Sequence, residues 1–118
     1  MTLARQAAEA RGRHGEWLAA SYLRAKGWHI LDQRVRTKAG EVDLVARRGT
    51  LIVFVEVKTR QSGGELDFAI DERRLARVAA AAEILLPRYA EQGEDARIDV
   101  ILIAPDTHLR HIENAWIG

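Results

Sequence analysis

Four side chains in the middle of the chain are of types that could bind a metal ion together. Glu41 and Asp43 begin one short apolar segment, and Glu56 and Lys58 end the next one. Carboxylate oxygens are the ligands preferred by hard divalent cations such as Mg²⁺ or Mn²⁺. An ammonium group beside such an ion can orient a water or stabilise charge on a phosphoryl oxygen. The chemistry that these residues suggest is metal-assisted hydrolysis of a phosphate ester.

A β-hairpin is the element that would bring these side chains together. Residues 41–46 and 51–59 are rich in apolar and β-branched residues, a composition typical of strands. Gly49, which lies between them, can adopt the positive φ of a tight turn. With a turn centred just before Gly49, Glu41 lies opposite Glu56. The run 51–55 is apolar on both faces, so the second strand is expected in the middle of its sheet.

Side chains alternate between the two faces of a strand, and opposed residues share a face. The residues predicted to lie on one face are Glu41, Asp43, Glu56 and Lys58. Two ionised carboxylates about 5 Å apart repel by roughly 3 kcal/mol at an effective dielectric constant of 20. A proton or a divalent cation is therefore expected within this cluster. The alternative is a set of exposed ion pairs of little energetic consequence.

A predicted helix over residues 14–26, ended by Gly27, adds one more acid to the candidate site. Glu16 shares a helical face with residues that are small or apolar: Ala19, Ala20 and Leu23. A carboxylate on that face is either buried or directed at a site. The alternative is an acid in the first turn that is stabilised by the helix dipole.

The remaining pattern defines the order of elements. Residues 28–36 are expected to form a strand near a sheet edge, and residues 61–64 a flexible loop. Residues 71–89 are expected to form a helix that Pro87 kinks or ends. Residues 96–104 should form a buried strand, and residues 109–117 are an optional edge strand. The inner stripe of the second helix is predicted to contain Leu75, Val78, Ala79, Ala82, Leu85 and Leu86. The order is α-β-β-β-α-β, which indicates an α/β fold.

Length and composition narrow the functional classes. The chain has 118 residues, 47% of them hydrophobic, which is enough for one core, so a single domain over residues 1–118 is expected. It contains no cysteine, which excludes thiolate metal sites and favours a reducing, cytoplasmic setting. Residues 1–13 lack the apolar stretch of a signal peptide, and no run approaches the roughly 18 residues of a membrane span. No membrane association is expected.

The distribution of charged residues along the chain is more informative about nucleic-acid binding than the net charge. The net charge of +1 does not by itself indicate a nucleic-acid binder. Many basic residues nevertheless fall between positions 34 and 77, where a local basic surface is predicted. The candidates for contacts with nucleic acid are Arg36, Lys38, Arg60 and Arg74. The histidines show no ligand spacing and are expected to be ordinary surface or edge residues: His14, His29, His108 and His111.

Two segments, Gly40–Val45 and Val53–Arg60, resemble the YraN family of bacterial proteins, which are predicted endonucleases similar to archaeal Holliday-junction resolvases. The resemblance implies a restriction-endonuclease-like core, a mixed central sheet flanked by helices, with a PD-(D/E)XK site. In that site Asp43 and Glu56 would ligate the metal, Lys58 would assist the nucleophile, and Glu16 would match the acid of the first helix. Because the related resolvases act as dimers, the resemblance also raises the expectation of a homodimer.

The sequence therefore predicts a nuclease that uses Mg²⁺ or Mn²⁺ to hydrolyse phosphodiester bonds in nucleic acid, with DNA, including branched DNA, as the expected substrate. The catalytic candidates are Asp43, Glu56, Lys58 and Glu16, and the metal ligands are Asp43, Glu56 and Glu41. The main alternative is a nucleic-acid-binding module that has the nuclease fold but no turnover. An enzyme acting on a small phosphorylated compound is less favoured, because the chain has no glycine-rich phosphate loop. A plain interaction protein is the remaining alternative.

Overall fold

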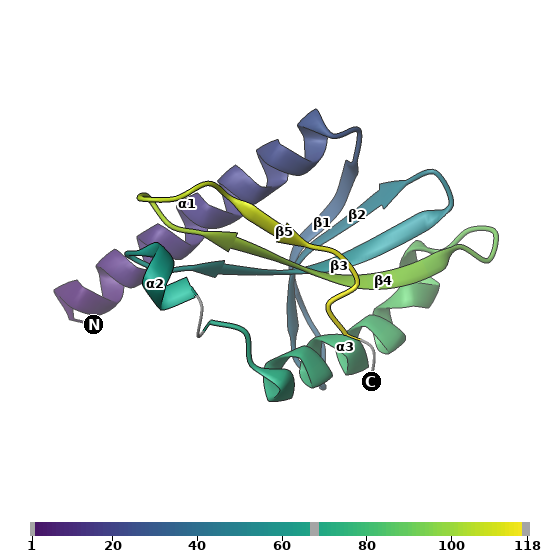
Figure 1. The fold of residues 1–118 in the computed structure, drawn as a ribbon. Helices are drawn as coiled ribbons and strands as arrows, with labels where there is room; N and C mark the ends of the chain where they lie inside the picture. Colours follow the sequence, from purple (N-terminus) through teal and green to yellow (C-terminus); the bar gives the residue numbers. More distant parts are fainter. Residues whose placement is uncertain (1, 67–68, 117–118) are drawn as a thin grey trace.

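The order of helices and strands agrees with the sequence prediction. The computed structural model describes residues 2–66 and 69–116 (Figure 1). Its helices are α1 (Leu3–Ala25), α2 (Gly63–Leu66) and α3 (Glu72–Tyr89), and its strands are β1 (His29–Arg36), β2 (Glu41–Arg48), β3 (Leu51–Thr59), β4 (Asp95–Ile103) and β5 (Arg110–Ile112). The α/β fold with the order α-β-β-β-α-β is confirmed, with α2 and β5 as short additions.

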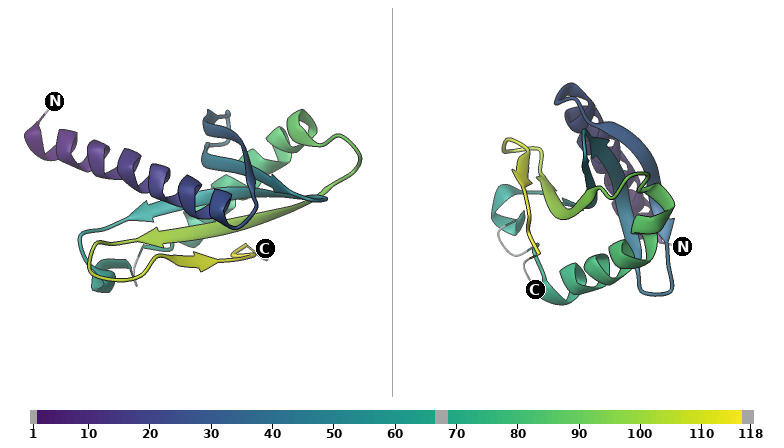
Figure 2. Two further views of the ribbon diagram at one scale, coloured as in Figure 1. Left: turned by 90° about the horizontal axis from the view of Figure 1, so that it is seen from above. Right: turned by 90° about the vertical axis from the view of Figure 1, so that its right-hand side faces the viewer.

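Strand β3 lies at the centre of a five-stranded sheet with the order β1-β2-β3-β4-β5. It pairs with β2 in the antiparallel sense and with β4 in the parallel sense, and the two outer pairs are antiparallel. Helices α1 and α3 cover opposite faces of this sheet (Figure 2). Val53 and Val55 pack under α1, whereas Ile52 and Phe54 pack under α3. The central place of β3 and the edge position of β1 were both predicted correctly.

Helix α1 is longer than the predicted helix over residues 14–26. It begins at Leu3, because the hydroxyl of Thr2 accepts a hydrogen bond from the Arg5 N–H at 3.1 Å and caps the first turn. The alanine-rich sequence that follows has a high helix propensity. Its first buried residue is Gly15. The N-terminal half of α1 therefore projects beyond the sheet (Figure 2).

The turn of the β2–β3 hairpin lies one residue further along than predicted. Arg48 pairs with Leu51, so the two central residues of the turn are Gly49 and Thr50. Gly49 has φ of 61°, and glycine at the first central position is the preference of a type II′ turn. The turn chemistry was recognised from the sequence, but the position of the glycine within the turn was not.

This turn corrects the register across the hairpin. The last pair of the ladder on this side is Leu44 with Val55. Continuing that register places Asp43, and not Glu41, opposite Glu56. The prediction that Glu41 faces Glu56 was therefore wrong by two residues, and the correction brings the two acids expected to act together into direct opposition.

The other boundaries differ only in detail. Helix α3 begins after Asp71, whose side chain accepts a hydrogen bond from the Arg73 N–H at 2.8 Å, and it ends at Tyr89, two residues after Pro87. Part of the predicted loop 61–64 forms α2, and the predicted edge strand 109–117 is reduced to β5, with residue 117 outside the described residues. Among the helices of the described residues, none has the length and apolar character that crossing a membrane requires.

Candidate active site

A glycine allows α1 to pack closely against the end of β3. A Cβ atom built on Gly15 would lie 2.0 Å from the Cγ2 atom of Thr59, so no larger residue fits there without a shift. The neighbouring residue in the helix is Glu16. The close packing at Gly15 therefore brings the Glu16 carboxylate to the end of the sheet where β2 and β3 separate.

Asp43 lies at the point where the alternation of β2 breaks. Val42 is buried in the cluster under α3, whereas Leu44 is buried in the cluster under α1, although residues two apart on a regular strand share a face. The Oδ2 atom of Asp43 accepts a hydrogen bond from the Val57 N–H at 2.7 Å. The side chain thus replaces a backbone partner for β3 just beyond the last pair of the ladder.

Glu56 is more deeply buried, with only 2% of its surface exposed. Its Oε1 atom lies 2.7 Å from Nε of Arg74 and 3.2 Å from Nζ of Lys58. Its Oε2 atom is buried and has no hydrogen-bond partner among the described residues. A buried carboxylate oxygen without a partner is energetically costly. A group that bonded to this oxygen would therefore stabilise the site.

The two carboxyl groups affect each other electrostatically. The pKa of Asp43 is raised from 3.8 to about 7, first because burial disfavours the charged form and second because of the negative charge of Glu56. The hydrogen bond from Val57 opposes this shift, as does the charge of Arg74. The repulsion predicted from the sequence is thus present, and the pair would be relieved either by a proton or by a cation.

Glu16 reaches the margin of this pair through an arginine. Its Oε1 atom lies 2.8 Å from Nε of Arg34, and its side chain is only 15% exposed. The register of β1 with β2 places Arg34 across from Asp43. Arg34 has φ of 51°, a left-handed conformation that is unusual for such a side chain. The predicted approach of Glu16 to the acids is therefore seen, with its charge compensated by Arg34.

Glu41 forms an ion pair of its own at the start of β2. Its carboxylate lies 3.2 Å from Nε of Arg36, and its side chain borders a hollow of about 240 Å³ whose lining also includes Arg74 and Arg77 of α3. Arg74 also binds Glu56, so Glu41 lies on the α3 side of the sheet. The strict alternation assumed for β2 breaks at Asp43, and the role of Glu41 as a metal ligand stays a prediction.

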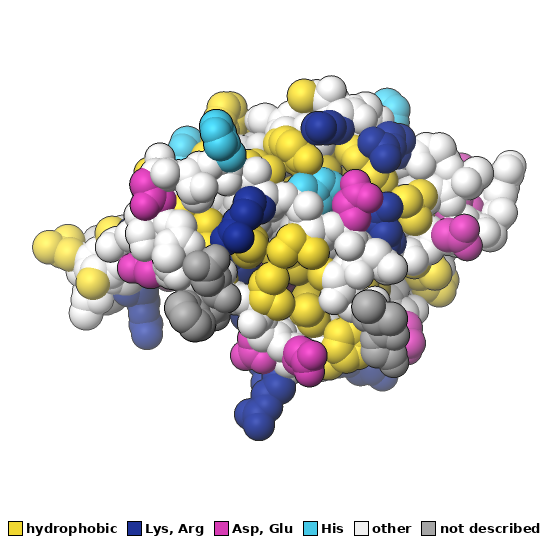
Figure 3. All heavy atoms as spheres, viewed as in Figure 1, with side chains coloured by type: hydrophobic (Ala, Val, Ile, Leu, Met, Phe, Trp, Pro, Cys, Tyr) yellow, Lys and Arg dark blue, Asp and Glu magenta, His cyan; other side chains and the backbone are white. Residues whose placement is uncertain are grey.

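The four candidate contacts with nucleic acid have different environments. Arg74 is held by Glu56 and Arg36 by Glu41, whereas a guanidinium nitrogen of Arg60 donates to the carbonyl oxygen of Thr59. Lys38 is exposed in the turn between β1 and β2. On the face seen in Figure 3, basic and acidic side chains are interspersed and form no continuous basic surface.

Asp43 and Glu56 are the residues that could hold a divalent cation. Within the described residues, no group of three or more acids or histidines is arranged to bind a metal. Mg²⁺ commonly keeps several waters and uses only one or two protein carboxylates together with substrate phosphates. The Glu56 oxygen that has no partner in the described part of the chain and the neighbouring carboxyl group of Asp43 fit this donor set.

A second buried acid, which the sequence reasoning missed, lies on β4. Asp99 is fully buried and is bound by Arg97 through two bonds of 2.8 and 2.9 Å, by His111 at 2.7 Å and by the N–H of Asn114 at 3.0 Å. His111 also contacts the hydroxyl of Tyr22 at 3.1 Å. His111 was expected to be an ordinary surface or edge residue. It does lie on the edge strand β5, but its ring is bound between Asp99 and Tyr22. The available signal was an acid inside a nearly continuous apolar strand.

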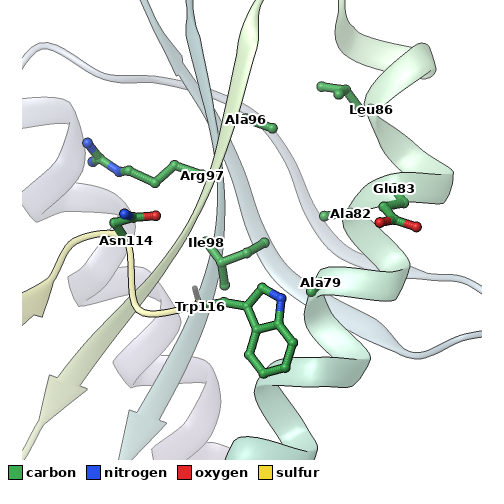
Figure 4. A pocket seen from close by; sticks show the side chains of 9 residues that line it. All are labelled: Ala79, Ala82, Glu83, Leu86, Ala96, Arg97, Ile98, Asn114 and Trp116. Carbon is green, nitrogen blue, oxygen red and sulfur yellow. The ribbon is translucent and has the colours of Figure 1, made fainter. Parts of the chain in front are cut away.

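The hollow between α3 and β4 is not a site of the same kind. It has a volume of about 210 Å³ and contains, among others, Ala82, Leu86, Ile98 and Trp116 (Figure 4). Among the described residues that line it, Glu83 alone has a carboxylate. The hydrophobic lining provides no pair of oxygen ligands, so the candidate chemistry remains at Asp43 and Glu56.

Comparison with known proteins places the chain in a family. The profile of the Uncharacterised protein family UPF0102 matches residues 15–103. UPF0102 proteins of Erythrobacter litoralis, Sphingopyxis alaskensis and Rhizorhabdus wittichii are 64%, 55% and 56% identical to it over 95%, 97% and 97% of the chain, and over 97%, 98% and 97% of their own lengths. The matched segment contains every residue of the candidate site. The chain therefore belongs to UPF0102, the YraN family that residues 40–60 resemble.

Proposed function

We propose that this protein is a metal-dependent nuclease that hydrolyses phosphodiester bonds in DNA. The observation that carries the proposal is the buried pair of Asp43 and Glu56, in which one oxygen of Glu56 has no partner within residues 2–66 and 69–116 and the pKa of Asp43 is raised to about 7. Perturbed carboxylates of this kind are concentrated at functional sites. A divalent cation between them would satisfy the free oxygen and remove the repulsion.

The residues around the pair have distinct roles in this proposal. A bound Mg²⁺ or Mn²⁺ would supply Lewis-acid activation of a water and of the scissile phosphate. Asp43 and Glu56 would hold it. Lys58, whose Nζ lies 3.2 Å from Glu56, would orient the attacking water and donate to a phosphoryl oxygen. Attack of that water on phosphorus breaks the bond to the leaving oxygen, and catalysis depends on stabilising the charge on the phosphoryl oxygens.

The arginine at Glu56 supports the alternative of binding without turnover. Arg74 lies 2.7 Å from Glu56 and already neutralises part of its charge, as a cation would. Against this, Arg74 contacts only Oε1 and its side chain is 45% exposed, so it leaves Oε2 free and has room to move toward a phosphate. A protein that only bound nucleic acid would gain nothing from two buried acids next to a phosphate backbone.

The proposal is tested by comparing the cleavage of nucleic acids by wild type and by a Lys58 variant. Plasmid, single-stranded and branched DNA, together with RNA, are incubated with Mn²⁺ or Mg²⁺. Lys58→Ala should lower the rate of cleavage by about 100-fold or more, the typical effect of losing one preorganised donor. The control is Lys26→Ala, because Lys26 follows the far end of α1, where its ammonium lies over the ring of Tyr22 and its backbone carbonyl accepts a bond from Arg48. Equal rates for wild type and Lys58→Ala, or no cleavage of any substrate, would contradict the proposal.

A further inference from the structure

One tryptophan of α1 is exposed beside the candidate site. Trp17 has 60% of its surface exposed, whereas Trp28 has 3%. Trp17 directly follows Glu16, and one residue corresponds to a rotation of about 100° around a helix. Its ring is therefore next to the Glu16–Arg34 ion pair but outside the packed face of α1. It belongs to neither hydrophobic cluster of the described residues.

The neighbours of Trp17 on the helix are an aromatic ring and a cation. The ring of His14 is stacked on that of Trp17, with centroids 6.0 Å apart and an angle of 15° between the planes. Arg13 lies one turn before Trp17, and residues four apart are neighbours on a helix surface. Arg13 is exposed and forms no ion pair with the other described residues. The nearby negative charge of Glu16 is compensated by Arg34.

This combination has the chemistry of a single-stranded nucleic-acid platform. Proteins that bind unpaired strands use exposed aromatic rings on which bases stack and nearby cations that contact the phosphates. Bases inside a duplex are already stacked on each other, so they cannot use such a ring without leaving the helix. The adjacent acids would repel a phosphate backbone, and Arg13 supplies the opposite charge at the approach to them.

We infer that Trp17, His14 and Arg13 bind an unpaired nucleotide, with the base stacked on Trp17 and its phosphate at Arg13. The inference deepens the proposed function, on which it rests for the class of ligand: the substrate is single-stranded or has unpaired bases next to the phosphate that is cleaved. A second copy of this chain packed on Trp17 is the competing occupant, and the experiment includes a measurement that detects it.

Binding is measured by fluorescence anisotropy in EDTA, so that cleavage plays no part. The probes are a short labelled oligothymidylate, an abasic strand of the same length and a duplex of the same length. Trp17→Leu should weaken binding of oligothymidylate about 5- to 150-fold, the range for one base stacked on an aromatic ring, and should leave the abasic strand unchanged. Trp17→Phe should keep most of the affinity. Leu3→Ala is the control, since Leu3 is 84% exposed at the far end of the same helix.

Three results would overturn the inference. The first is equal affinity of wild type and Trp17→Leu for oligothymidylate, and the second is an equal loss for the abasic strand. The third is a change of sedimentation from dimer to monomer in Trp17→Leu, which would show a protein interface. If any of these three results is obtained while Mn²⁺-dependent cleavage is observed, only the inference is wrong. If the stacking pattern is observed without any cleavage, the inference stands and the nuclease proposal fails.

Discussion

Two buried carboxylate regions of this protein have opposite electrostatic character. Asp99 is fully buried, and its oxygens accept bonds from Arg97, His111 and a backbone N–H. Burial alone would raise the pKa of Asp99, but these hydrogen bonds and the charge of Arg97 outweigh it and lower that pKa. At Asp43 and Glu56 the pKa of Asp43 is raised and one buried oxygen lacks a partner.

The difference separates a structural acid from a functional one. A carboxylate that is completely hydrogen-bonded contributes to a unique packing of the elements around it, here α1, β4 and β5. A carboxylate pair that is incompletely paired is stable only because the rest of the fold holds it in place, and it has a free energy to gain from a ligand. Burial alone does not distinguish the two regions; the number of satisfied oxygens does.

The largest expected effect of a single substitution is at the structural acid. Asp99→Asn removes the buried charge that pairs with the partly buried Arg97 and disturbs the bond to His111. Breaking one partner of a buried ion pair typically costs about 3–5 kcal/mol, so the free energy of unfolding measured with urea should fall by about that amount. Asp95→Asn, an exposed acid at the start of the same strand, should change it by less than about 0.5 kcal/mol. Equal effects of the two variants would remove the contrast.

The pH dependence of stability should reveal the second region. The pKa of Asp43 is about 7 in the folded protein and near 3.9 in an unfolded chain. Between these values the folded state binds more protons than the unfolded state, so stability falls as pH rises. Asp43→Asn lacks this loss. In EDTA its advantage over wild type should grow from nearly zero at pH 4 to as much as about 4 kcal/mol at pH 8. A difference independent of pH in urea titrations would contradict the raised pKa.

A divalent metal should stabilise the folded protein only when the pair of Asp43 and Glu56 is intact. At 100 times its dissociation constant, Mn²⁺ should stabilise wild type by about 2.7 kcal/mol. For a domain of this size that is an increase in melting temperature of about 10 °C. Asp43→Asn should lose this increase, and the exposed-site control Asp95→Asn should keep it. If Mn²⁺ shifts wild type and Asp43→Asn equally, or shifts neither, the acids do not form a metal site.

A smaller effect is expected where α1 meets β3. In Gly15→Ala the new Cβ atom would clash with Thr59, whose β-branched side chain has little freedom to move. Overpacking of this kind costs about 1–3 kcal/mol. Adding Thr59→Ser, which removes the clashing methyl group, should restore most of the stability. Gly12→Ala is the matched control, because its Cβ atom meets nothing within 4 Å, and it should stabilise the helix by up to about 1 kcal/mol.

Much of the fold could be predicted because its signals are local. The apolar run 51–55 indicated a central strand, and the capping, glycine and periodicity patterns identified the helices. The register of the hairpin was predicted wrongly because Gly49 is suited to more than one position in a tight turn, and the sequence does not state which. The start of α1 was missed because residues 3–10 are exposed, so this part of the helix has no amphipathic pattern to recognise.

The site was predictable only as far as the hairpin determines it. Asp43, Glu56 and Lys58 come from two strands joined by a short turn, so their proximity follows from local pairing. The break in the alternation of β2 at Asp43 accompanies packing under both helices. The bonds between Asp99 and His111 join segments whose proximity depends on the complete sheet. No spacing in the sequence encodes either of these.

The irregular backbone of β1 also affects how the molecule behaves in a crowded solution. A strand at the edge of a sheet presents unpaired backbone groups that a strand from another molecule could extend, which leads to aggregation. In β1 the ladder shifts between Ile30 and Asp32, and Arg34 has a left-handed backbone. Both features bend the strand and prevent a straight partner from pairing along its length. The conformation that places Arg34 beside Glu16 thus also protects the open edge of the sheet.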